Sequence, residues 1–95
     1  MVRFITLLRF TEQGAKNIKK SSARAAAFRK AAAKRGVKVE SQLWTAGAYD
    51  GLIILSATNE AKLLGAIASL AAQGNVHTET LRAFDAVEFA AITVR

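Results

Sequence analysis

The run from Val2 to Phe10 constrains the fold more than any other feature, because it carries apolar side chains on both of its faces. Its β-branched and aromatic residues predict a β-strand, in which successive side chains point to opposite faces. Phe4 and Leu8 share one face with Phe10, and Ile5 and Leu7 share the other. A strand of this kind needs cover on both sides. The sheet that contains it therefore requires two covering layers.

Two alanine-rich segments predict helices that can supply one of these layers. The first runs from Ala23 to Arg35 and ends at Gly36, after a start at Ser21 and Ser22. Its inward stripe is expected to contain Phe28. The second begins after Asn59, a good N-cap, and ends before Gly74. Thr11 offers an additional, earlier helix start directly after the first strand.

Three further strands and a short terminal helix are predicted around these segments. The strands cover residues 37–46, 52–57 and 75–84, with a turn over 47–51 and a helical turn over 85–91. Asp50-Gly51 within the turn is a common hairpin signal. The order β-α-β-β-α-β predicts an α+β, ferredoxin-like domain over residues 1–95, with a four-stranded antiparallel sheet and helices on one face.

Two features predict self-association. Helices on one face leave the other face of the sheet open, and a second copy of the chain could cover it. The segment 61–74 also carries a single charge, Lys62, and a helix without a polar face is usually buried on more than one side. We therefore expect a homo-oligomer, either a dimer or a larger assembly. The alternative for 61–74 is an alanine-rich surface helix.

Composition excludes several classes of function. The 95 residues include no cysteine, so disulfides and thiolate metal sites are ruled out, and we expect neither a metal nor another cofactor. No apolar stretch approaches the ~20 residues of a membrane span. The first residues also lack the layout of a signal peptide, which predicts a cytoplasmic protein without a membrane partner.

The net charge of +7 is concentrated in one segment, residues 16–38. Nine basic residues lie there without an acidic one: Lys16, Lys19, Lys20, Arg24, Arg29, Lys30, Lys34, Arg35 and Lys38. Such a segment is either a solvated helix face that keeps an oligomer soluble or a surface that binds nucleic acid nonspecifically, with strong dependence on salt. The motif of an RNA-recognition sheet is missing from the sequence, which favours the solvated face.

Three blocks of the sequence resemble the GYD domain family. They are Phe10-Thr11-x-Gln13-Gly14, Trp44-Thr45-x-Gly47-x-Tyr49-Asp50 and Gly74-Asn75-Val76-x-Thr78-x-Thr80-Leu81-Arg82-Ala83-Phe84. The resemblance implies a ferredoxin-like fold similar to that of dimeric α/β-barrel proteins, in which two sheets face each other. It implies no particular activity. The chain departs from the family pattern in its basic first helix and in lacking a proline after the third strand.

The hairpin turn and the strand before it supply three candidate site residues. Tyr49 and Asp50 can serve the turn alone, or they can form an acid/base or hydrogen-bonding pair at the mouth of a pocket. By strict alternation, Trp44 lies on the strand face of Lys38, Glu40 and Gln42, opposite Leu43. A large aromatic residue on that more polar face suits an oligomer interface or a ligand pocket.

The last strand supplies three more candidates. His77 and Glu79 share a face, where they can form a hydrogen-bonded pair or an acid/base unit. A metal site would need further ligands, and the chain has no second histidine. Arg82 can bind a carboxylate or phosphate, or it can pair with Asp85, Glu88 or an acid of a neighbouring subunit.

These observations predict a homo-oligomer that is structural or binds a small ligand through a sheet-to-sheet cleft. The residues expected at that cleft or interface are Trp44, Tyr49, Asp50, His77, Glu79 and Arg82. The alternative is an enzyme of the dimeric α/β-barrel kind, a cofactor-free oxygenase or isomerase, with His77 and Asp50 as proton-transfer groups. Whether the chain is an enzyme stays open at this point.

Overall fold

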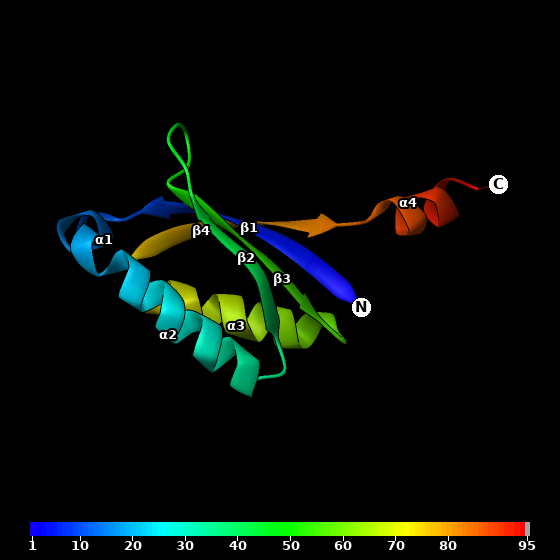
Figure 1. Cartoon of the computed structure of the whole chain (residues 1–95), viewed down its shortest axis with the longest axis horizontal. Helices are drawn as coiled ribbons and strands as arrows, with labels where there is room; N and C mark the ends of the chain where they lie inside the picture. The colour runs from blue at the N-terminus through cyan, green and yellow to red at the C-terminus, as the bar shows by residue number, and fades with distance from the viewer. Residues whose placement is uncertain (95) are drawn as a thin grey trace.

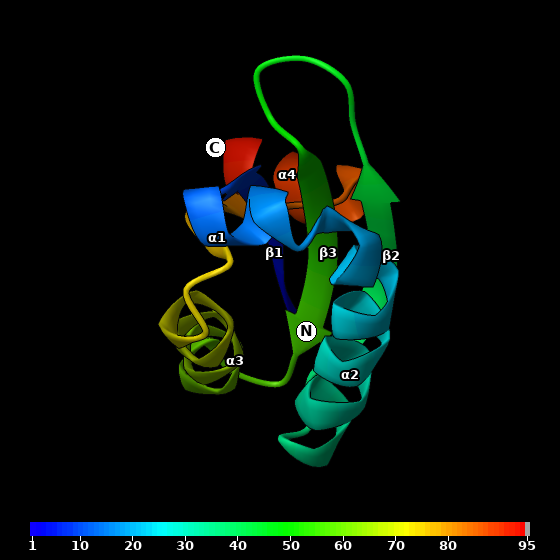
Figure 2. The ribbon, with the colours of Figure 1, turned by 90° about the vertical axis from the view of Figure 1, so that its left-hand side faces the viewer.

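The computed structural model describes residues 1–94 and has the predicted α+β, ferredoxin-like architecture (Figure 1). The four strands form one antiparallel sheet in the order β2-β3-β1-β4. Helices α2 and α3 lie on the same face of this sheet (Figure 2). The elements are β1 (Val2–Phe10), α1 (Glu12–Lys16), a short 3-10 helix η1 (Ile18–Lys20), α2 (Ser21–Lys34), β2 (Lys38–Trp44), β3 (Gly51–Ala57), α3 (Glu60–Ala72), β4 (Val76–Ala83) and α4 (Ala86–Thr93).

Local signals in the sequence fix the ends of the helices. The Thr11 hydroxyl accepts a 3.1 Å hydrogen bond from the Gly14 N–H, and the Asn59 side chain accepts one of 3.0 Å from Lys62 N–H. Both are side-chain N-caps, as the sequence predicts. Gly36 has a φ angle of 79° in the left-handed region that glycine favours, where it ends the helical turn. A helix begins at each of the two predicted starts: α1 follows Thr11, and α2 begins at Ser21. The 3-10 helix η1 separates the two.

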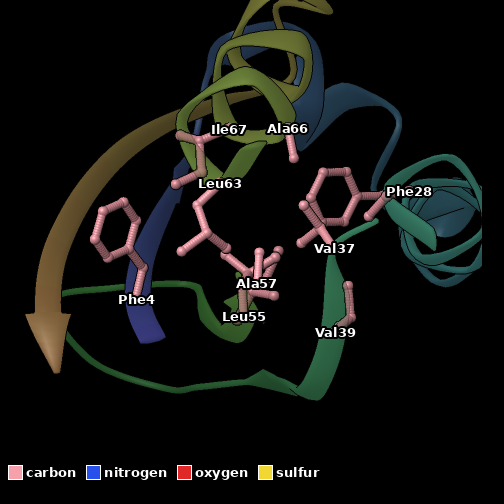
Figure 3. Packing of buried hydrophobic residues seen from close by; sticks show 11 residues of the cluster. Phe4, Phe28, Val37, Val39, Leu55, Ala57, Leu63, Ala66 and Ile67 are labelled. Atoms are coloured by element: carbon pink, nitrogen blue, oxygen red, sulfur yellow. The ribbon is translucent and has the colours of Figure 1, made fainter. Parts of the chain in front are cut away.

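The hydrophobic core lies between the sheet and helices α2 and α3 (Figure 3). Leu55 of β3 and Leu63 of α3 are completely buried at its centre. Phe28 enters from α2, as its place on the predicted inward stripe requires, and Phe4 enters from β1. The core also holds one polar side chain of the sheet, Thr6, which forms a 3.1 Å hydroxyl–hydroxyl hydrogen bond with Thr80.

The predicted orientation of side chains in the second half of β2 is wrong, because the strand contains a β-bulge at Glu40. Val39 pairs with Leu55, but Ser41 already pairs with Ile54, so the strand gains one residue relative to β3. Side chains after the bulge therefore point to the opposite face from the one that strict alternation predicts. Trp44 and Gln42 thus face the helices rather than sharing the face of Lys38 and Glu40, while Leu43 turns away from the helices.

The second face of the sheet carries no helix layer, and we call it the open face. Its central side chains are apolar and half-buried: Ile5, Leu7, Leu52 and Ile54. On the two outer strands, Leu43 is 54% exposed and Leu81 is 47% exposed. The predicted two-sided apolar pattern of β1 is thus present, with only one of its two sides covered in the single chain.

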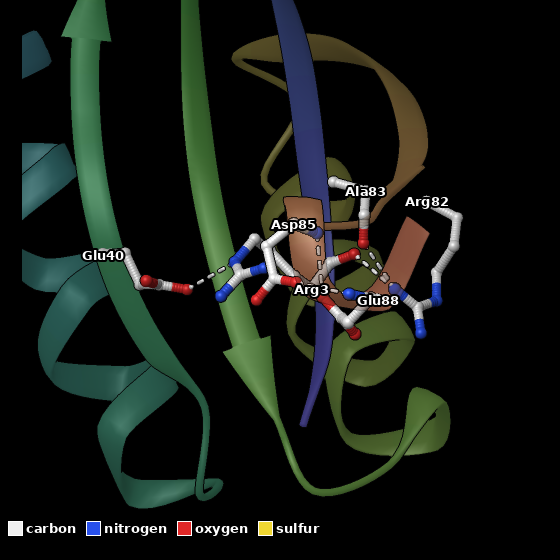
Figure 4. Close-up of polar contacts among 6 residues, drawn as sticks. All are labelled: Arg3, Glu40, Arg82, Ala83, Asp85 and Glu88. Carbon is white, nitrogen blue, oxygen red and sulfur yellow. Dashed lines mark hydrogen bonds and ion pairs between the residues drawn. The ribbon is translucent and has the colours of Figure 1, made fainter. Parts of the chain in front are cut away.

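The C-terminal helix α4 projects from the end of β4, away from the rest of the chain (Figure 1). It is anchored at its start, where Arg3 contacts both Glu40 and Glu88 at 3.3 Å (Figure 4). Its apolar side chains, including Val87 and Phe89, are exposed. No helix within residues 1–94 is long and apolar enough to cross a membrane.

Candidate functional site

A polar cluster occupies the hairpin end of the open face. The Tyr49 hydroxyl donates a 2.5 Å hydrogen bond to the Glu79 carboxylate, which joins the β2–β3 turn to β4. The Arg9 guanidinium lies 4.7 Å from the centre of the Tyr49 ring, a cation–π contact, and its Nε donates to the Ala48 carbonyl. These side chains and His77 line a shallow pocket of about 80 Å³. The cluster can donate and accept hydrogen bonds at the edge of an apolar surface.

The environment of Tyr49 keeps its phenol protonated. The hydrogen bond to Glu79 raises the pKa of Tyr49 above its usual 10, and desolvation and the negative charge of Glu79 act in the same direction. Arg9 opposes this shift because its positive charge favours the phenolate. At neutral pH, Tyr49 is therefore a hydrogen-bond donor rather than a base.

Removing the Glu79 charge should lower the pKa of Tyr49. In Glu79→Gln, the phenol loses its strong acceptor and the nearby Arg9 remains, so the phenolate becomes easier to form. Tyr49 is the single tyrosine of the chain, so the ultraviolet absorbance of tyrosinate reports on it directly during an alkaline titration. We expect a midpoint above 10 in the natural chain and a lower one in the variant. Equal midpoints would show that Glu79 does not hold the Tyr49 proton in solution.

Two of the predicted site residues, Trp44 and Asp50, lie on the helix side of the sheet instead. Both line a second pocket, of about 70 Å³, between α2, the start of the hairpin and the C-terminal end of α3. The Asp50 carboxylate accepts a 2.8 Å hydrogen bond from the Phe10 N–H, which fastens the hairpin to the end of β1. Tyr49 and Asp50 thus line different pockets, and each side chain is hydrogen-bonded to another residue, Glu79 and Phe10 respectively.

Arg82 lies at the far end of β4 from the polar cluster. Its guanidinium stacks on the Phe84 ring, with 4.5 Å to the ring centre, and donates to the carbonyls of Arg3 and Ala83. The Glu88 carboxylate, one of the alternative partners predicted for Arg82, forms an ion pair with Arg3. The structure thus places Arg82 apart from the pocket of Tyr49, His77 and Glu79.

Two arginines in these pockets were not singled out from the sequence. Arg9 shares the open face of β1 with Leu7, and alternation along the strand could have placed it there. Arg24 lines the helix-side pocket. It precedes Phe28 by four residues, a spacing that puts both on one face of the helix and could have predicted its partial burial. For His77 and Glu79, no third carboxylate or imidazole is placed nearby to complete a metal site within residues 1–94.

Comparison with known proteins supports both the fold and the relationship to the GYD domain family. The model of the GYD domain family matches residues 4–93. The crystal structure of TTHA0845 from Thermus thermophilus is similar in fold, with a TM-score of 0.57 and 24% sequence identity over 90% of this chain and 96% of that one. No protein of curated function matches the chain.

Proposed function

This chain belongs to the GYD domain family, and from that premise we propose that it works as a homodimer that binds a small molecule between two open sheet faces. The observation that supports this proposal best is the combination on one surface of an apolar sheet face and a polar pocket at its edge. The apolar part would hold the two subunits together. The polar part would orient the ligand.

The amount of exposed surface supports pairing with a second copy. The single chain exposes 6135 Å², whereas a compact monomer of 10.2 kDa exposes about 5300 Å². The excess is comparable to the roughly 800 Å² that each partner buries in an interface of standard size. The radius of gyration, 14.1 Å, also exceeds the roughly 12 Å of a compact chain of this length, because α4 projects from the body.

The distribution of charge favours the open face as the contact between copies. On and around that face, three basic side chains (Arg3, Arg9 and Lys38) are balanced by three acidic ones (Glu40, Glu79 and Glu88). The segment 16–35, by contrast, contributes eight positive charges, four of them on α2. Two copies that met through α2 would repel each other, whereas two open faces are electrically neutral.

Helix α4 is expected to contribute to the same interface. Its capping box, formed by Asp85 and Glu88, fixes the start of the helix. Its exposed apolar side chains, however, have no cover within the described subunit. In the proposed dimer, these side chains pack on the partner. This contact extends the interface beyond the sheet.

The ligand proposed for the enclosed cleft carries a hydrogen-bond donor, such as a hydroxyl or amino group. Glu79 uses one carboxylate oxygen to accept from Tyr49, which leaves the second oxygen to accept from a ligand. The half-buried Leu7 forms the apolar wall of the pocket. An enzymatic role would need a base at this place, and since the Tyr49 phenol stays protonated, Glu79 and His77 are the groups that could provide one.

Native mass spectrometry of the purified chain tests this proposal. We expect a dimer that carries the additional mass of a small molecule, and we expect Glu79→Gln to keep the dimer while losing most of that mass. Lys30→Gln, which changes an exposed charge on α2, is the control and should retain the ligand. If the dimer of the natural chain had no mass beyond that of its two subunits, the proposed ligand binding would be contradicted, but the proposed dimer would not.

A further inference from the structure

The pocket on the helix side of the sheet contains a half-buried arginine, one of whose terminal nitrogens is buried and has unused hydrogen-bonding capacity. Arg24 of α2 lines this pocket, and one of its terminal nitrogens, Nη1, donates a 2.8 Å hydrogen bond to the Asn17 carbonyl. The other, Nη2, is buried and has no hydrogen-bond partner among residues 1–94. A buried donor without an acceptor costs about 1–3 kcal/mol, and more when it is charged. An acceptor from outside the chain would remove this cost.

The walls around Arg24 are largely apolar. Phe10, Phe28, Trp44 and Leu70 line the same pocket, from β1, α2, β2 and α3 respectively. A charge in surroundings of this kind interacts more strongly with an opposite charge than it does in water. The pocket therefore favours a ligand that presents an anionic group to Arg24 and apolar carbon to the walls.

Ser21 adds a second polar contact close to the first. Its hydroxyl oxygen accepts a 2.9 Å hydrogen bond from the Trp44 indole N–H. The hydroxyl hydrogen stays available, because a serine hydroxyl can donate and accept at the same time. Ser21 and Arg24 lie one turn apart at the start of α2, so their donors can reach one small group.

We propose that this pocket binds a small organic monocarboxylate, whose carboxylate receives hydrogen bonds from Arg24 Nη2 and the Ser21 hydroxyl and whose short apolar chain contacts Phe28 and Trp44. The planar guanidinium matches a carboxylate in geometry and charge. The volume of about 70 Å³ suits a short carbon chain better than a large ring system. A doubly charged anion fits less well, because the Asp50 carboxylate lines the same pocket.

This site is separate from the cleft proposed above. It lies on the helix side of the sheet, so pairing of two open faces leaves it accessible. Binding there depends neither on the dimer nor on the polar cluster of Tyr49 and Glu79. The two proposals can therefore fail independently.

Butanoate binding, followed by tryptophan fluorescence, tests the inference. Trp44 is the single tryptophan of the chain and lines the pocket, so its emission reports on the site directly. We expect a saturable change in Trp44 fluorescence on titration with butanoate. In Arg24→Gln, the affinity for butanoate should be lower by about 10- to 100-fold, because a charge-assisted hydrogen bond is lost. Lys30→Gln, with the same change of charge on an exposed position of α2, should bind as the natural chain does.

Two further probes decide whether recognition depends on the carboxylate. Butyramide has the same shape without the charge, and we expect it to bind at least about 10-fold more weakly. Equal binding of the amide, or tighter binding of inorganic phosphate than of butanoate, would overturn the assignment to a monocarboxylate. So would the absence of a saturable signal, or an unchanged affinity in an Arg24→Gln variant whose circular dichroism shows that it is folded.

Discussion

Replacing either Leu43 or Leu81 with glutamate should convert the proposed dimer into monomers. The two leucines lie at opposite edges of the open face, where they are 54% and 47% exposed in the single chain. The substitution therefore costs the isolated subunit little. In a twofold dimer each change occurs twice in one interface, and each buries a carboxylate in an apolar contact. We expect the dissociation constant to rise at least about 100-fold, equivalent to about 3 kcal/mol.

Sedimentation velocity over a range of protein concentrations measures this effect. The matched control is Leu64→Glu on α3, since Leu64 is a leucine of similar exposure, 51%, on the opposite side of the molecule. The control should stay dimeric. If Leu64→Glu dissociated the assembly while the two open-face variants remained dimers, the contact between copies would involve α3 instead, as the apolar character of that helix also allows.

Replacing Gly14 with alanine should strongly destabilise the fold, because the added Cβ atom has the shortest contact of any at the six glycines. A Cβ atom at Gly14 would lie 2.0 Å from the carbonyl oxygen of Asn75, a backbone atom that cannot rotate away. The same oxygen accepts a 3.1 Å hydrogen bond from the Thr11 N–H, which joins the end of β1 to the start of β4. The alanine must push these segments apart, at an expected cost of about 3 kcal/mol.

Thermal unfolding of the variant, at the same protein concentration as the natural chain, measures this cost. We expect the melting temperature to fall by about 15 °C for a domain of this size. Gly65→Ala on α3 is the control, because the nearest atom to its new Cβ is 3.5 Å away, an ordinary contact. This second change should raise stability by about 0.5–1 kcal/mol, since alanine favours a helix more than glycine does. A Gly14→Ala melting temperature within a few degrees of the natural one would contradict the close contact.

The elements of the fold could be predicted from the sequence because their signals are local. Thr11 and Asn59 cap helices through contacts with residues three positions away, and Gly36 ends a helix by its own backbone conformation. The bulge at Glu40 leaves no such signal. It depends on how β2 pairs with β3, and a single extra residue moved Trp44 and Leu43 to the faces opposite to those predicted.

From the sequence we could select Tyr49, His77 and Glu79 of the polar pocket, but neither Arg9 nor the arrangement of these residues. Tyr49 and Glu79 are 30 positions apart and meet because the β2–β3 turn and β4 lie at the same end of the sheet. The sequence instead suggested pairing Tyr49 with its neighbour Asp50, and Glu79 with His77. Contacts between distant segments depend on register and on the direction of the turn, neither of which hydrophobic periodicity determines.

The mass of the intact natural chain in native mass spectrometry tests the central claim most directly. Pairing of two open faces predicts a species of twice the 10.2 kDa subunit mass that persists on dilution to micromolar concentrations. A species of a single subunit mass at all concentrations would contradict it. The apolar open face and the exposed side chains of α4 would then have to contact a molecule other than a second copy of this chain.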